Sequence, residues 1–351
     1  MVPTSLIAFT VALIASLGLT VPTRALALRM GMVDHPGPRK VHLTPIPLLG
    51  GLAMYWGVIL AIVVSMDSQA RAQIVGIVAG ATLVALVGVL DDRGLLHHQI
   101  KLFAGMPLAT LILMASGIRV QLLEALWPGR AALTADLALT LFWVVGITAS
   151  FSIFDHMDGL CAGVAAMAAA FFTVFATLRG QVMVSTLAAA VMGAAIGFLR
   201  WNFKPAKIFM GDGGAMFLGF LMATLGLKLR LADLPHATSW MIPVLILGVP
   251  IFDTTLVTIS RLRRGLLPFS TPGKDHAAHR LANLGVGQRG AVLALYALGG
   301  VFGLLALWVS RLQVGQAWLL GGLVLAGILG AVAWFERAPF ERQQPDDKAA
   351  A

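Results

Sequence analysis

Long apolar stretches separated by short polar connections dominate the chain. A helix needs about 17 to 25 apolar residues to cross a hydrocarbon core of about 30 Å, and among open structures only a helix satisfies its own backbone there. These stretches predict an all-α, polytopic membrane protein with about eleven transmembrane helices. The segments run approximately over residues 4–22, 46–65, 72–90, 102–118, 133–150, 161–178, 182–199, 214–227, 240–260, 291–310 and 315–334.

The first apolar segment resembles a signal peptide, since Ala25-Leu26-Ala27 has the small-residue form of a cleavage site. However, no Lys or Arg precedes the segment, whereas Arg24 and Arg29 follow it. We therefore interpret it as a retained helix whose N-terminus lies outside.

The charges of the connections predict the orientation of the other segments. With eleven spans, the connections after odd-numbered helices and the C-terminal tail carry 18 Lys and Arg, against 7 on the other side. The positive-inside rule makes the first face cytoplasmic. We expect one transmembrane catalytic domain over residues 1–335 and a short polar cytoplasmic tail over 336–351.

Composition excludes several classes of soluble protein. Of the 351 residues, 58% are hydrophobic and 12% are charged, against roughly 25% charged residues in globular proteins. The single cysteine, Cys161, rules out an intramolecular disulfide and a C-x-x-C zinc site. The net charge of +9 indicates loops that face anionic lipid and phosphate, not nucleic acid.

Acidic residues gather on the same predicted face as the basic ones. Asp91 and Asp92 end the third apolar segment, and Lys101 follows at the start of the fourth. The adjacent carboxylates indicate either an ordinary solvated helix end or a cation site. Lys101 either extends to the membrane interface or binds a phosphate.

Two further acidic connections have a pattern typical of ligand binding. Asp155 and Asp158 lie three residues apart in a loop without a basic residue, which favours a divalent cation or a ribose hydroxyl. Asp212 stands between glycines directly before a helix, where backbone and carboxylate can approach a ligand closely. Asp212 could instead be an N-cap, and spacing alone slightly favours that interpretation.

The longest basic connection, residues 261–290, contains His276, His279 and Arg280. The histidine spacing suits a helical metal site, yet the sequence offers no evident third nitrogen or sulfur ligand. Histidine and arginine donors that bind a diphosphate are the simpler interpretation. The alternative is a basic patch held by anionic lipid.

These loops together place several carboxylates, cationic side chains and glycines on one membrane face. Carboxylates bind Mg²⁺, Mg²⁺ binds diphosphate, and phosphoryl transfer depends mainly on such positioning and charge neutralisation. A soluble nucleotide can reach this face from water, and a lipid acceptor can arrive through the bilayer.

The motifs resemble those of the polyprenyl-phosphate N-acetylhexosamine-1-phosphate transferases, the glycosyltransferase 4 group that includes phospho-N-acetylmuramoyl-pentapeptide-transferase. The similarity runs from about Asp34 to Arg289. It includes Asp34-His35-Pro36, Arg39-Lys40-x-His42, Pro45-Ile46-Pro47-x-x-Gly50-Gly51, Asp91-Asp92 with Lys101, Asp155-x-x-Asp158-Gly159-Leu160, Lys207-x-Phe209-Met210-Gly211-Asp212-x-Gly214, Pro268-Phe269 and Asp275-His276-x-x-His279-Arg280-Leu281.

The resemblance implies transfer of a sugar 1-phosphate from a UDP-N-acetylhexosamine to undecaprenyl or another polyprenyl phosphate, with release of UMP. This would start the synthesis of a cell-envelope glycan, such as a cell-wall polymer or O-antigen, at the cytoplasmic face of a bacterial inner membrane, with a homodimer as one possible assembly. The implied cofactor is Mg²⁺, or Mn²⁺. The implied roles are catalytic for Asp91, Asp92, Asp155 and Asp158, metal-binding for Asp212 and Asp158, and substrate-binding for Lys101, His276, His279, Arg280, Lys40 and His42.

The chain departs from the family pattern at three positions. Ala149 and Ser152 stand where the family usually has asparagines, and Ala278 stands within its histidine run. These losses leave room for altered or absent activity, so a non-catalytic paralogue is one alternative. A transporter or lipid flippase is another, for which Asp253 after Pro250 is the one indication.

Overall fold

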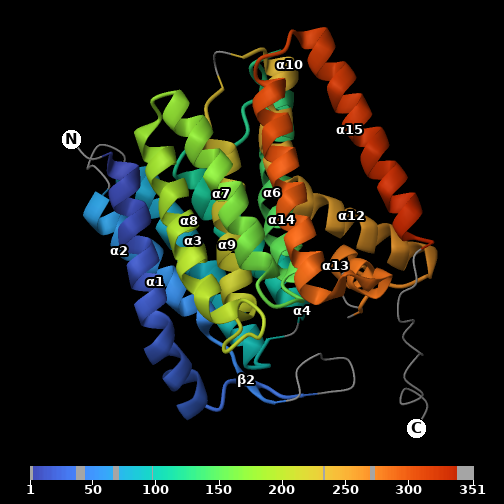
Figure 1. The fold of residues 1–351 in the computed structure, drawn as a ribbon. Coiled ribbons are helices and arrows are strands. Elements are labelled where there is room, and N and C mark those ends of the chain that lie inside the picture. Colours follow the sequence, from blue (N-terminus) through green and yellow to red (C-terminus); the bar gives the residue numbers. More distant parts are fainter. Residues whose placement is uncertain are drawn as a thin grey trace.

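The computed structural model of the 351-residue chain describes residues 3–36, 44–65, 71–96, 98–231, 234–268 and 273–337. These residues form a helical bundle with one short antiparallel pair of strands (Figure 1). In chain order the elements are α1 (Thr4–Arg29), β1 (Val33–Asp34), β2 (Ile46–Pro47), α2 (Gly50–Ser65), α3 (Arg71–Asp92), α4 (His98–Ile100), η2 (Lys101–Gly105), α5 (Met106–Ala115), α6 (Arg130–Phe154), α7 (Leu160–Leu178), α8 (Val182–Asn202), α9 (Gly211–Lys228), α10 (His236–Ser239), α11 (Met241–Ile246), α12 (Gly248–Arg263), α13 (Ala277–Leu281), η3 (Ala282–Val286), α14 (Gly287–Val309) and α15 (Val314–Phe335).

Each predicted apolar segment coincides with one or more of these helices, so the prediction of a polytopic all-α protein is confirmed. The count of eleven spans is not confirmed. Among the described residues, seven helices are long and apolar enough to cross a membrane, or eight if one bent pair counts as a single span. The shorter apolar helices α2 (Gly50–Ser65) and Lys101–Ala115 fall below that length.

The ninth predicted segment is not one continuous helix. The helical residues His236–Ile246 and Gly248–Arg263 are bent by 78° relative to each other, and α12 runs at a steep angle to α14 in Figure 1. Pro250 lies in the first turn of α12 and cannot donate a backbone hydrogen bond to the preceding turn. The apolar pattern continues through this break, and so composition alone does not reveal it.

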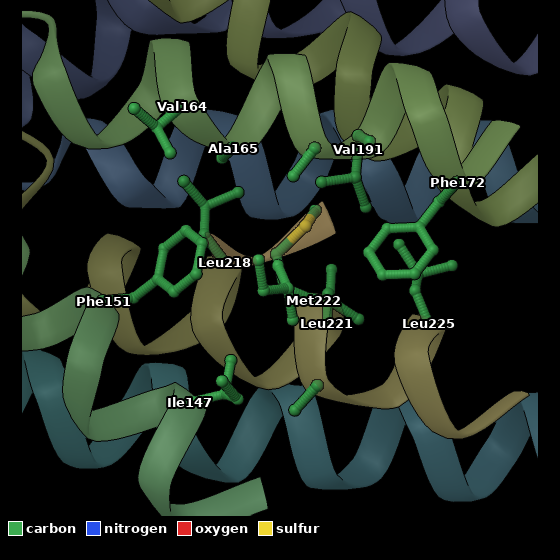
Figure 2. Close-up of a cluster of buried hydrophobic side chains, with 14 of the residues drawn as sticks. Ile147, Phe151, Val164, Ala165, Phe172, Val191, Leu218, Leu221, Met222 and Leu225 are labelled. Atoms are coloured by element: carbon green, nitrogen blue, oxygen red, sulfur yellow. The ribbon is translucent and has the colours of Figure 1, made fainter. Parts of the chain in front are cut away.

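The helix α9 occupies the centre of the bundle. It packs against α2, α3, α6, α7 and α8, and every residue from Gly213 to Leu225 is buried. Figure 2 shows side chains of α6, α7 and α8 closing around Leu218, Leu221, Met222 and Leu225 of α9. Because α9 begins at Gly211, this packing fixes Asp212 in the middle of one end of the bundle.

The Gly50-Gly51 pair lets α2 approach the start of α9. A Cβ atom on Gly51 would lie 2.2 Å from the Cα of Gly214, so no larger residue fits between the two backbones. The N–H groups of Gly50 and Gly51 donate to the carbonyls of Phe209 and Met210. The first-loop motif therefore holds the segment that precedes Asp212.

Candidate active site

Lys101 joins two of the acids that the sequence singles out. Its Nζ donates to Oδ2 of Asp91 at 2.7 Å and to Oδ2 of Asp212 at 2.6 Å. The side chains of Lys101 and Asp212 retain 19% and 23% of their exposure, so the ion pair is open to a ligand. Asp91 lies on α3, Lys101 on η2 and Asp212 on α9, and α3 contacts both of the other helices.

Asp92 has a different position from its neighbour Asp91. Its Oδ1 and Oδ2 accept hydrogen bonds from the backbone N–H groups of Asp212 (2.8 Å) and Gly213 (3.2 Å). Gly211 has a φ of +70°, and a Cβ there would lie 2.4 Å from the Asp92 carboxylate. Asp92 thus caps α9 from another helix, through a close approach that glycine permits.

The side chain of Asp212 faces the cluster and does not cap its own helix. Besides Lys101, it accepts a hydrogen bond at Oδ1 from the Ser152 hydroxyl at 2.5 Å. The N-cap interpretation of Asp212 is therefore wrong, because α9 begins after Met210 and Asp92 supplies the acceptor. Ser152, which the sequence presents as the loss of a polar ligand, still contributes a polar contact.

Asp155 lies close enough to the same cluster for its charge to interact with those of Asp212 and Asp92, and Asp158 adjoins Asp155. Burial, followed by the charges of Asp212, Asp92 and Asp158, raises the pKa of the Asp155 carboxyl to about 8. Asp158 accepts a hydrogen bond from the N–H of Ala206 at 3.0 Å, and so it also holds the loop that leads to α9. This group of acids is short of positive charge.

The acidic cluster fits a hard divalent cation. Its side-chain donors are the carboxylate oxygens of Asp91, Asp155, Asp158 and Asp212 and the Ser152 hydroxyl, with Lys101 as the one ammonium among these described groups. Oxygen ligands without thiolate or imidazole suit Mg²⁺ or Mn²⁺ and not Zn²⁺. Asp92 is the least suited ligand, since both its oxygens hold backbone N–H groups.

A cavity of about 520 Å³ borders the cluster beside the end of α1. Asp92 lines it together with Arg93, Leu95 and the segment 30–33. The Arg93 side chain contacts the sulfur atoms of Met30 and Met32. Of the acids described above, Asp92 is the one that lines this cavity.

A second group consists of three imidazoles. His156, between Asp155 and Asp158, lies 3.9 Å from His276 and 4.8 Å from His279 by ring centroids. Both ring nitrogens of His156 are buried, and no hydrogen-bond partner for them exists among the described residues. Burial and the two neighbouring histidines hold the pKa of His156 well below its ordinary value. The histidine loop thus contacts the acidic loop directly.

These histidines do not form a convincing metal site. His156, Asp253 and His276 each offer a ligand atom within 4.8 Å of the others. However, the His156 and His276 rings lie almost face to face, with planes inclined by 31°. Their in-plane lone pairs therefore do not converge on one point. Nearby Arg261 also disfavours a cation.

Asp275 organises the basic loop. Arg261 donates to both its carboxylate oxygens, at 3.0 and 2.9 Å, and Arg264 donates at 2.5 Å. Although burial opposes ionisation, these guanidinium groups lower the pKa of Asp275 to about 2. The two arginines are therefore tied to the loop itself.

The remaining substrate-binding predictions have different outcomes. Arg280 is fully buried, and its guanidinium donates to Phe335, Ser260, Asp275 and Glu336. These contacts join α13 to the end of α15 and orient the Arg280 guanidinium there. Lys40 and His42 lie outside the described residues.

Sequence reasoning did not assign His156 or Asp253 to the site. His156 supplies the third imidazole that the histidine spacing lacks, but it comes from the loop between α6 and α7. Asp253 lies on α12 and contacts His276. Only the packing of distant segments brings these residues together, and their local sequence carries no signal of it.

Known proteins match this arrangement of motifs. The family model described as glycosyl transferase family 4 matches residues 74–230. A probable undecaprenyl-phosphate N-acetylglucosaminyl 1-phosphate transferase of Bacillus subtilis is 35% identical over 303 residues, covering 86% of this chain and 84% of that protein. The chain belongs to glycosyl transferase family 4.

Two further relatives are also similar over most of the chain. A decaprenyl-phosphate N-acetylglucosaminephosphotransferase of Mycobacterium tuberculosis is 32% identical, covering 91% of this chain and 86% of that protein. An undecaprenyl-phosphate alpha-N-acetylglucosaminyl 1-phosphate transferase of Escherichia coli is 25% identical, covering 78% and 75%. The family resemblance seen in the sequence is thus confirmed over most of the chain.

Proposed function

We propose that this protein transfers N-acetylhexosamine 1-phosphate from a UDP-sugar to a polyprenyl phosphate, giving a polyprenyl-diphospho-sugar and UMP. The observation that carries the proposal is the Lys101–Asp212 ion pair, which lies at the start of the central helix α9 among four other acids. Relatives that cover most of the chain are named for transfer of this kind to undecaprenyl or decaprenyl phosphate.

The reaction exchanges one phosphorus–oxygen bond for another. An oxygen of the lipid phosphate attacks the β-phosphorus of the donor, and the bond from that phosphorus to the bridging oxygen breaks. UMP leaves with the bridging oxygen, while the sugar keeps its phosphate. Such a step needs positioning and neutralisation of phosphate charge more than covalent participation by the protein.

The side chains of the cluster divide this work. Lys101 neutralises phosphate oxygens, and Ser152 holds the Asp212 carboxylate in one orientation through their hydrogen bond. Asp92 fixes the start of α9, whose positive dipole end faces the same region. His276 and His279 lie beside the Asp155–Asp158 loop, where they would bind donor phosphates.

Mg²⁺, or Mn²⁺, would be held by Asp212 with Asp155 and Asp158. When bound, the ion would neutralise the diphosphate and increase the electrophilicity of its phosphorus. Asp91 would position the lipid phosphate, since it shares Lys101 with Asp212.

We further propose that the site faces the cytoplasm at a bacterial inner membrane. The excess of Lys and Arg in the connections on this side supports that orientation, and a nucleotide donor is available there. The product would serve as the lipid-linked starter of a cell-envelope glycan.

Two observations bear on the alternatives. Asp253, the acid that indicated transport, has both carboxylate oxygens in contacts with His276 and Ala277. Ser152 preserves a polar contact to Asp212 where the family usually has asparagine. These contacts favour an active transferase over a transporter or a non-catalytic paralogue.

Product analysis tests the proposal. Purified protein with Mg²⁺ and undecaprenyl phosphate is incubated separately with UDP-GlcNAc, UDP-GalNAc and UDP-MurNAc-pentapeptide, and products are identified by mass spectrometry. We expect one donor to give a lipid-diphospho-sugar and an equal amount of UMP, and reactions without acceptor to give neither. Folded protein that makes no lipid product from any UDP-sugar would contradict the proposal.

A further inference from the structure

Asp253 is a buried acid for which the proposed reaction has no use. It lies on α12, five residues after the bend, and is fully buried. Its Oδ2 lies 2.7 Å from Nδ1 of His276, and its Oδ1 accepts the N–H of Ala277 at 2.7 Å. A buried carboxyl costs free energy unless its oxygens are paired, and both are paired with the start of the histidine loop.

We propose that Asp253 is the positioning residue of His276, which fixes both the orientation of the imidazole and the nitrogen that carries its proton. This inference rests on the proposed function, because it assigns His276 a ligand. An ionised carboxylate only accepts hydrogen bonds. With Asp253 as the acceptor, as we propose, Nδ1 of His276 is the donor, and Nε2 is left for the ligand.

The contacts on the other side of His276 give this orientation a consequence. The ring lies 3.9 Å from His156, which stands between Asp155 and Asp158. With Nδ1 held by Asp253, the ring is fixed against the loop that carries the two acids. Contacts thus run from Asp253 on α12 through His276 to the acidic loop. They leave Nε2 of His276 as the nitrogen that would bind a phosphate oxygen.

Asp253 also anchors the backbone at this place. Ala277 is the first residue of α13, and its N–H has Asp253 as acceptor. Asp253 therefore caps α13 from a neighbouring helix. A substitution that removes the side chain would disturb both the cap and the ring, so it cannot separate positioning from folding.

Asp253→Asn separates the two roles. The amide oxygen still accepts the N–H of Ala277, but the amide nitrogen donates to Nδ1 of His276 and forces the proton to Nε2. We expect transfer to fall about 10- to 100-fold, by analogy with the loss of the hydrogen-bond partner of a metal-ligating histidine, with the thermal midpoint close to that of wild type. Thr254→Val is the matched control, because the Thr254 hydroxyl is buried without a partner in the described structure and its loss should leave activity unchanged.

The deciding measurement is the ¹⁵N spectrum of histidine-labelled protein at pH 8, with His276→Gln used to assign the signal. We expect the His276 proton on Nδ1 in wild type and on Nε2 in Asp253→Asn. The same tautomer in both proteins would overturn the proposal. This spectrum needs no turnover, so it decides the inference even if the protein proves not to be a transferase.

A double-mutant cycle provides the second readout. If Asp253 acts through His276, Asp253→Asn combined with His276→Gln should be no slower than His276→Gln alone, within about twofold. Effects that multiply would show that Asp253 acts by another route and would overturn the proposal. A merely structural acid would lower the thermal midpoint without this coupling.

Discussion

The carboxylate of Asp92 accepts a hydrogen bond from the backbone N–H of Asp212, 120 residues further along the chain. Asp91, next to Asp92, instead forms an ion pair with Lys101. The adjacent acids therefore have different roles.

We expect Asp92→Ala to destabilise the protein by about 1–2 kcal/mol, because it leaves two N–H groups at the start of α9 without an acceptor. Asp91→Ala should leave stability close to wild type, since Lys101 retains Asp212. Thermal unfolding of both variants in detergent measures the difference. Equal midpoints would contradict the capping role.

Asp212→Asn should lower transfer at least about 10²- to 10³-fold, because it removes charge neutralisation and positioning from a phosphoryl-transfer site. Folding should be unaffected, since Asp92 and not Asp212 caps α9. Initial rates and thermal midpoints are measured together. Glu124→Gln is the control, because it also replaces a carboxylate with an amide. Glu124 forms a surface ion pair with Arg119 and precedes the N-terminus of α6, whereas the acidic cluster lies at the C-terminus of that helix. Near wild-type turnover of Asp212→Asn would remove the metal assignment.

Metal removal provides an independent check of the oxygen-ligand set. Activity should be lost with EDTA, return with Mg²⁺ or Mn²⁺, and not return with Zn²⁺ alone, because the acidic cluster offers carboxylates and a hydroxyl. Assays at matched ionic strength measure this. Full turnover in metal-free buffer would disagree with the proposed cofactor.

Topology is testable with single cysteines in a Cys161→Ala background, because the native thiol is fully buried. Leu95→Cys and Leu267→Cys should be labelled from the cytoplasmic side, and Leu126→Cys from the outside; the leucines are 65%, 73% and 55% exposed. Membrane-impermeant maleimide on intact cells and on inverted vesicles measures this. Labelling of residues 95 and 267 from opposite sides would contradict a single-face site.

Much of the fold and part of the site follow from the sequence. The length of the apolar segments predicts the helices. Loop acids such as Asp91, Asp155 and Asp212 identify the end of the bundle at which the candidate site lies. The break before Gly248 is invisible to composition because apolar residues continue through it. The caps supplied by Asp92 and Asp253 are equally invisible, since each acid serves a helix distant in the chain. Arg280 has the residue type of a phosphate ligand, yet its burial beside Phe335 and Glu336 depends on how α15 packs.

The most direct test of the proposed function follows the β-phosphate. Purified protein receives a UDP-N-acetylhexosamine labelled with ³²P at the β-phosphate, together with undecaprenyl phosphate and Mg²⁺, and the lipid and aqueous phases are separated. We predict the label in the lipid phase, with unlabelled UMP in the aqueous phase in equal amount. Label recovered as UDP while the sugar enters the lipid would show glycosyl transfer without the phosphate, and would contradict the proposed reaction.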